Sequence, residues 1–265
     1  MARLKHRDAG VRLAALQALV PVAVILDLGP SGSSKEGEDG NQKEGGEVRK
    51  DGDEETSCAQ DAPGGVTVSG ILAAMAAGLE DGDSQVRQAA VEALSKAASG
   101  SGCRDMALVA LVTAHVRHEK AEVRQTALHA LLGVAKRGDA QAISLASLCL
   151  RDEEAEVRQA AVRVFGGVAT RGDKRAANAL RGIQRDKDAG VRQAVMKIYG
   201  NVMGKGDKQA IAAARARLQD SHSSVREAAV EALAEISEKG DERSIAAFSA
   251  SLQDDDAGVR QAARR

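Results

Sequence analysis

The sequence predicts an all-α protein, an α-solenoid of stacked antiparallel helix pairs, and two repeated patterns carry that prediction. A Val-Arg pair heads an Ala-rich apolar stretch seven times, and the last five of these arginines stand 34 residues apart. An Arg/Lys-Gly-Asp triplet recurs between the stretches with the same period. A fixed period of roughly 20 to 50 residues is typical of architectures in which each unit packs only on its neighbours. The seven arginines are Arg12, Arg87, Arg124, Arg158, Arg192, Arg226 and Arg260.

Residues 139–172 show how one repeat predicts two helices. Asp139 follows Gly138 and can cap a first helix, because its carboxylate accepts free backbone N–H groups. Apolar residues at three-to-four spacing predict a first helix of about 11 residues and a second of about 15 that starts near Ala155. We expect Arg171 in the last turn of the second helix and Gly172 in the left-handed conformation just past it. The apolar positions are Ile143, Ala146, Cys149 and Leu150, then Val157, Ala160, Ala161, Val164, Phe165 and Val168.

The same pattern divides the chain into three parts. Residues 1–27 form a partial N-terminal repeat, 28–66 are an insertion, and 67–265 hold five full repeats and a truncated C-terminal one. Solenoid ends normally carry polar caps, and neither end shows one. We therefore expect a fragment of a longer repeat array, an incomplete gene model, or an end that a partner covers. The expected state is a monomer or a fragment of a longer array. The full repeats are expected at 67–99, 103–137, 139–171, 173–205 and 207–239.

The insertion is acidic and rich in Gly and Ser. Within it, residues 31–62 contain ten acidic and four basic side chains, a balance of −6, with almost no apolar residue. Such a composition buries too little surface to offset its ordering entropy, so the sequence predicts disorder. It is either a tolerated solvated loop or a regulatory or partner-binding arm.

The N-terminal apolar run has two interpretations. A basic start followed by 14 mostly apolar residues from Leu13 to Leu26 resembles a signal peptide. The rival is a repeat helix at 9–27, because Val11-Arg12-Leu13-Ala14-Ala15 aligns with 225–229, although Pro21 counts slightly against a straight helix. Removing 28–66 leaves a spacing from Arg12 to Arg87 close to that of the other repeats, which favours the repeat helix. The run is shorter than the roughly 20 residues of a membrane span, so no membrane partner is expected.

Composition limits the partners and the compartment. The formal charge is −1, from 37 basic and 38 acidic residues, and the only aromatic residues are Phe165, Tyr199 and Phe248. Nucleic acid is therefore not an expected partner, because it favours a strongly basic surface and aromatic stacking platforms. The three cysteines are odd in number and far apart, which indicates reduced thiols and a cytoplasmic, or else nuclear, location. They are Cys58, Cys103 and Cys149.

The repeat resembles the HEAT repeat family, and most closely its short phycobilisome-lyase-like subclass. In that family an acidic residue in the turn within each repeat and an arginine in the second helix form a ladder along the superhelix. Here the acidic residue lies six positions before the arginine, except that His6 and His118 stand before Arg12 and Arg124. The resemblance implies a structural ladder of Asp81, Arg87, Arg124, Asp152, Arg158, Asp186, Arg192, Asp220, Arg226, Asp254 and Arg260.

Catalytic chemistry finds little support in the sequence. The resembling family includes a diiron hydroxylase with several His-Glu pairs, but this chain has one such pair, His118-Glu119, with His115 and His129 nearby. One pair cannot fill a dinuclear site. We therefore expect no catalytic residue, metal or cofactor, and a protein that is not an enzyme. The alternative is a subunit of a bilin lyase-like enzyme or of a HEAT-repeat metal hydroxylase.

Two residue positions repeat beside the ladder arginines. The residue directly after the arginine is mostly Gln, and the residue five positions after it is basic in the middle repeats and acidic at Glu92 and Glu231. A protein partner of opposite polarity would fit such a surface, so the sequence favours an interaction scaffold or adaptor. We name six of these positions the second-helix column: Gln125, His129, Gln159, Arg163, Gln193 and Lys197.

Overall fold

The computed structural model describes residues 2–27, 67–99 and 105–265. In these ranges every regular element is helical, with two short 3₁₀ helices and thirteen α-helices, which confirms the predicted all-α class. The elements are η1 (Ala2–Lys5), α1 (Ala9–Asp27), α2 (Val68–Ala77), η2 (Gly78–Glu80), α3 (Ser84–Ala98), α4 (Asp105–His115), α5 (Ala121–Val134), α6 (Ala140–Cys149), α7 (Ala155–Val168), α8 (Lys174–Ile183), α9 (Ala189–Val202), α10 (Lys208–Arg217), α11 (Ser223–Ile236), α12 (Glu242–Ser251) and α13 (Ala257–Ala262).

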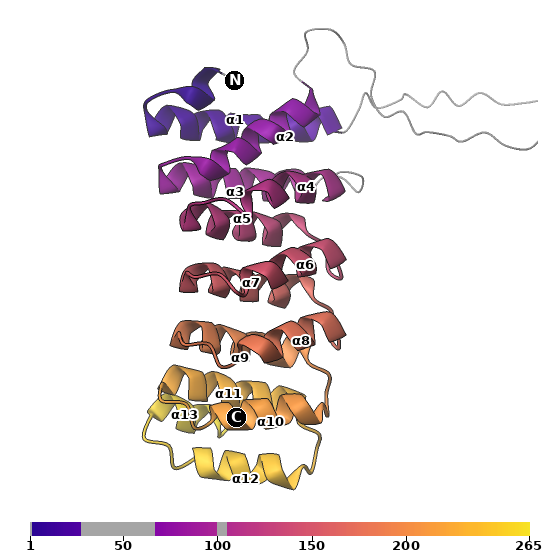
Figure 1. Ribbon diagram of the computed structural model, residues 1–265, viewed down its shortest axis with the longest axis vertical. Coiled ribbons are helices and arrows are strands. Elements are labelled where there is room, and N and C mark those ends of the chain that lie inside the picture. Colours follow the sequence, from indigo (N-terminus) through magenta and orange to yellow (C-terminus); the bar gives the residue numbers. More distant parts are fainter. Residues whose placement is uncertain (1, 28–66, 100–104) are drawn as a thin grey trace, which may run out of the picture.

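The helices form pairs that pile into an elongated stack (Figure 1). Each even-numbered helix from α2 to α12 is the first of its pair, and the odd-numbered helix after it is the second. Each second helix packs on the second helix of the next repeat, from α1 on α3 to α11 on α13. The predicted α-solenoid of stacked antiparallel pairs is therefore confirmed, and its second helices make one continuous row.

Local sequence explains where the helices begin. In the repeat at 139–172, α6 starts at Ala140 and α7 at Ala155, both as predicted. The Asp139 carboxylate accepts the backbone N–H groups of Gln141 at 2.8 Å and Ala142 at 3.0 Å, and so satisfies donors that the helix leaves free. The same cap recurs at Asp173, Asp207 and Asp241.

Glycine in each Arg/Lys-Gly-Asp triplet adopts a left-handed backbone. Gly138, Gly172, Gly206 and Gly240 have φ between 76° and 83°, a region that favours glycine because it lacks Cβ. The bend also aims the Gly138 N–H at the carbonyl of Val168, at the end of the next repeat's second helix, over 2.7 Å. The triplet thus joins neighbouring repeats as well as separating helices.

One predicted position within the repeat was wrong. Arg171 does not lie in the last turn of α7, because that helix ends at Val168 and the backbone of Ala169 is extended. Instead, the Arg171 guanidinium donates to the carbonyl of Gly200 on α9 over 2.8 Å. This hydrogen bond therefore joins two neighbouring repeats.

The N-terminal run forms a second helix of the stack. Helix α1 continues through Pro21 to Asp27 and packs against α3, with Leu16 and Ala23 buried. The insertion 28–66, with Cys58 inside it, and Cys103 lie outside the described residues.

The core follows the predicted stripes. All ten apolar positions predicted for α6 and α7 are buried, and Phe165 and Tyr199 are the largest fully buried side chains. Small residues allow the second helices to approach closely: a Cβ on Gly133 would lie 2.9 Å from the Cβ of Ser95 on α3. Such contacts leave no room for an added methyl group without movement.

Candidate interaction surface

The ladder arginines join each repeat to the next one. Arg192 on α9 donates its Nε and a terminal nitrogen to the two carboxylate oxygens of Asp220, at 2.8 and 2.7 Å. Asp220 lies 28 residues later, in the turn before α11. A terminal nitrogen of the same guanidinium donates to the carbonyl of Asp186, six residues earlier, over 2.9 Å. Arg192 thus closes the turn of its own repeat and binds the turn of the next one.

Five such bidentate pairs occur among the described residues. They are Arg12–Asp81, Arg124–Asp152, Arg158–Asp186, Arg192–Asp220 and Arg226–Asp254, with Nε to Oδ2 distances of 2.6 to 2.8 Å. The pairs are shielded most in the middle of the stack, where the Asp220 side chain is 3% exposed, against 13% for Asp81. Arg12 reaches Asp81 across 69 residues of sequence, so the pairing bridges the insertion.

The histidines in the acidic position do not deprive the arginines that follow them of a carboxylate partner. Arg12 and Arg124, which follow His6 and His118, both have carboxylate partners in the next repeat. Arg87 lacks a carboxylate partner among the described residues, because the corresponding position in the repeat after it is His118. Among the described residues the Arg87 side chain donates only to the carbonyls of Asp81 and Gly82, at 2.8 and 3.2 Å. The Arg260 side chain likewise donates to carbonyls there, those of Asp254 and Asp255.

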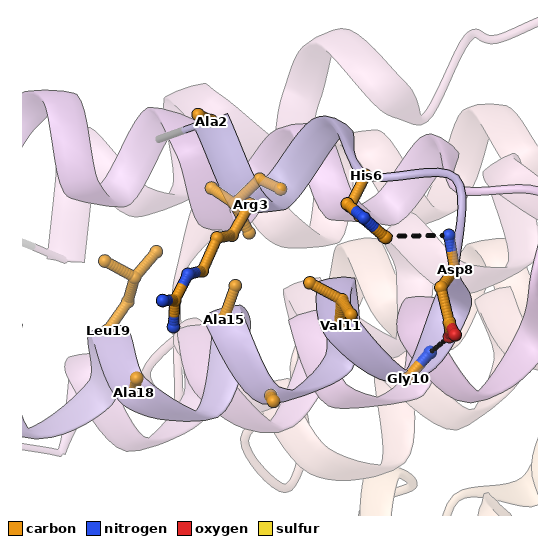
Figure 2. Close-up of a pocket in the computed structure, with 11 residues that line it drawn as sticks. Ala2, Arg3, His6, Asp8, Gly10, Val11, Ala15, Ala18 and Leu19 are labelled. Atoms are coloured by element: carbon orange, nitrogen blue, oxygen red, sulfur yellow. Dashed lines mark hydrogen bonds between the residues drawn. The ribbon is translucent and has the colours of Figure 1, made fainter.

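His6 and His118 still make the hydrogen bond by which the acidic residue closes the turn. The ladder aspartates accept the N–H two residues ahead, as Asp152 does from Glu154 over 3.0 Å. His118 accepts the N–H of Lys120 through Nδ1 over 3.0 Å, and His6 accepts that of Asp8 over 3.1 Å (Figure 2). The Nδ1 acceptor of each imidazole therefore preserves the hydrogen bond of the turn without the ion pair.

The arginine partners contribute to lowering the pKa of Asp81, Asp152, Asp220 and Asp254. The hydrogen bond from Arg12 is the largest influence on Asp81 and lowers its pKa, as Arg226 lowers that of Asp254. Burial of Asp220 acts in the opposite direction, but the Arg192 hydrogen bond, the His222 N–H and nearby guanidinium charges outweigh it. The pKa of Asp220 is lowered as a result, and Asp152 follows the same pattern.

The second-helix column lies on α5, α7 and α9, which are adjacent in the continuous row. Arg163 and Lys197 are exposed and form no ion pair within the described ranges, whereas Gln125 and Gln193 are half-buried. Gln159 already makes a hydrogen bond within the protein, because its Nε2 donates to the carboxylate of Asp188 in the next repeat over 3.2 Å.

His129 and Arg163 lie close together on neighbouring helices. Burial lowers the pKa of His129, and the positive charge of Arg163 lowers it further. His129 is therefore held neutral, and Arg163 and Lys197 carry the charge of the column. On either side of the column, Glu92 of α3 and Glu231 of α11 are exposed, and Glu231 lies 3.8 Å from the Arg265 guanidinium.

The residues considered for metal binding make separate contacts. His115 Nε2 lies 3.3 Å from a carboxylate oxygen of Glu80, His118 closes its turn, and His129 lies beside Arg163. Cys149 is buried in the core, and burial raises its pKa to about 11.

A cavity of about 890 Å³ opens at the N-terminal end of the stack. Figure 2 shows Val11, Ala15, Ala18 and Leu19 of α1 along its floor, with η1 and Arg3 on the other side. In α3 the corresponding positions Val86, Ala90, Ala93 and Leu94 are buried. The cavity thus lies over the face of α1 that corresponds to the packed face of α3, the face on which a second helix packs.

Comparison with known proteins places the chain in a family. The family model of HEAT repeats matches residues 72–164 and 200–265, so the chain belongs to the HEAT repeat family. No curated protein matches it.

Solved structures share the fold at low sequence identity. A designed armadillo repeat protein in complex with the peptide (KR)4 is 18% identical, over 73% of this chain and 96% of that one, with a TM-score of 0.50. An archaeal HEAT-like repeat protein from Thermococcus onnurineus is 13% identical, over 95% of this chain and 94% of that one, with a TM-score of 0.52. No helix in the described ranges is long and apolar enough to span a membrane.

Proposed function

We propose that the chain is a protein-interaction scaffold that binds an acidic segment of a partner protein along the second-helix column. The observation that carries the proposal is the pair of exposed cations, Arg163 and Lys197, on adjacent helices of a continuous row. Other arginines of that row, such as Arg158 and Arg192, are occupied by the ladder. The two free cations are therefore available to a partner's carboxylates.

The neighbouring Gln side chains support an extended peptide as the bound segment. Gln125 and Gln193 are half-buried and make no side-chain hydrogen bond within the described ranges. A side-chain amide can both donate to and accept from a peptide backbone, so these positions suit a main chain that crosses the helices. The armadillo repeat structure was solved with a basic peptide, whereas the basic centre of this column fits an acidic one.

A pull-down with charge-reversed protein tests the proposal. The variant Arg163→Glu/Lys197→Glu should lose the partner that the wild-type chain recovers from native extract. The control Arg185→Glu/Lys187→Glu reverses two exposed cations in the turn before α9 and should retain it. Recovery of the same partner by all three proteins would contradict the proposal.

A further inference from the structure

A groove between the first helices α10 and α12 brings together four cationic side chains. The groove has a volume of about 470 Å³ and is lined by Lys208 and Arg215 of α10 and by Lys239 and Arg243 of the next repeat. The carboxylates of Glu238 and Asp241 also line it, so its cations outnumber its anions by four to two. In the part of the chain that the structure describes, none of the four side chains makes a hydrogen bond or ion pair. Ile211 and Ala212 supply an apolar wall.

The equivalent arginine one repeat earlier is paired. Arg181 of α8 donates to the Asp207 carboxylate over 2.6 Å, and Asp207 caps α10. Arg215 and Asp241 occupy the same positions one repeat later, 34 residues on. Their side chains are not bonded to each other, although the charge of Arg215 contributes to lowering the pKa of Asp241.

Ser244 explains the difference. Its hydroxyl, which is buried, donates to the Asp241 Oδ2 over 2.6 Å and also contacts the hydroxyl of Ser237 over 2.7 Å. The equivalent residue in the preceding repeat is Ala210, which leaves Asp207 free to accept Arg181. Asp241 is therefore occupied from within its own helix, and half-buried Arg215 faces the groove unpaired.

From this arrangement we infer that the groove is a second interaction site, which binds an extended Asp/Glu-rich segment of a partner protein. Lys208 and Arg215 are seven residues apart on one helix face, a separation of about 10 Å along the axis. In an extended polyproline II segment, which has three residues per turn and rises about 3.1 Å per residue, carboxylates three positions apart lie on one side about 9 Å apart, so they reach both cations. A single phosphate cannot span it. This site shares no residue with the second-helix column.

Fluorescence anisotropy with a labelled peptide tests the inference on the full chain. The probe is a 12-residue Gly/Ser peptide with Glu at every third position, and the control peptide has Gln at those positions. The Glu peptide should bind, and Lys208→Glu/Arg243→Glu should weaken its binding at least tenfold. Arg163→Glu/Lys197→Glu should leave it within twofold, which separates this site from the proposed function. Circular dichroism confirms that each variant is folded.

Ser244→Ala provides a test without any change in charge. The variant frees the Asp241 carboxylate to accept Arg215, as Asp207 accepts Arg181, so binding of the Glu peptide should fall at least threefold. Unchanged binding in this variant would overturn the role of Arg215. Equal binding of the Gln peptide, or preferential binding of a singly phosphorylated peptide or a single-stranded oligonucleotide, would overturn the site.

Discussion

The ladder predicts that equivalent arginines contribute very different amounts to stability. Arg192→Met removes one partner of a shielded pair. The Asp220 side chain, which is 3% exposed, then keeps two hydrogen bonds, from Arg217 at 3.4 Å and from the His222 N–H. Breaking such a pair costs about 3 kcal/mol, the lower end of the range for buried pairs, because the Arg192 side chain keeps 11% exposure.

Arg87→Met is the matched comparison, since Arg87 has no carboxylate partner among the described residues. It loses two hydrogen bonds to carbonyls, a cost of about 1 kcal/mol. Urea unfolding followed by far-UV circular dichroism measures both free energies of unfolding. If the two variants lose the same stability, or if Arg192→Met loses less than about 1 kcal/mol, the ladder does not hold the repeats together as described.

Three further predictions concern acid, backbone and packing. The pKa values of Asp81 and Asp254 are lowered in the folded state. Their contribution to stability is therefore present above the ordinary carboxyl pKa of about 3.9 and is lost as the pH falls through the lowered values. The urea midpoint should drop between pH 7 and pH 3, and a constant midpoint would contradict this. Gly172→Ala meets nothing within 4 Å but keeps φ at 80°, so about 1 kcal/mol should be lost from backbone strain alone, and an unchanged melting temperature would refute it. Ala161→Leu overpacks a fully buried position and should cost about 1–3 kcal/mol in urea unfolding, whereas Ala212→Leu on the exposed face of α10 should cost little.

Much of the fold follows from short-range sequence signals. The caps at Asp139 and Asp173 and the left-handed glycines after the second helices depend on neighbouring residues, so their spacing in sequence was sufficient to predict them. The end of α7 was misjudged because a hydrogen bond from Gly138, in another repeat, determines how its last carbonyl is satisfied.

Contacts between repeats were harder to predict. A spacing of six identifies the Asp and Arg positions, but the carboxylate that each arginine binds lies in the next repeat, and this register is visible only in three dimensions. The hydrogen bond from Ser244 to Asp241 was missed for the same reason. The sequence does carry a signal for it, because the equivalent positions in the two preceding repeats are Ala176 and Ala210. The second-helix column remains a prediction about function.

A charge-swap measurement tests the scaffold proposal most directly. Once a partner is captured, the acidic residues of its binding segment are changed to Lys, and its affinity for the wild-type chain and for Arg163→Glu/Lys197→Glu is measured by titration calorimetry. The account predicts that each single change weakens binding at least tenfold and that the two changes together restore it. Failure of the swapped pair to recover, while both proteins remain folded, would contradict direct contact between those carboxylates and the column.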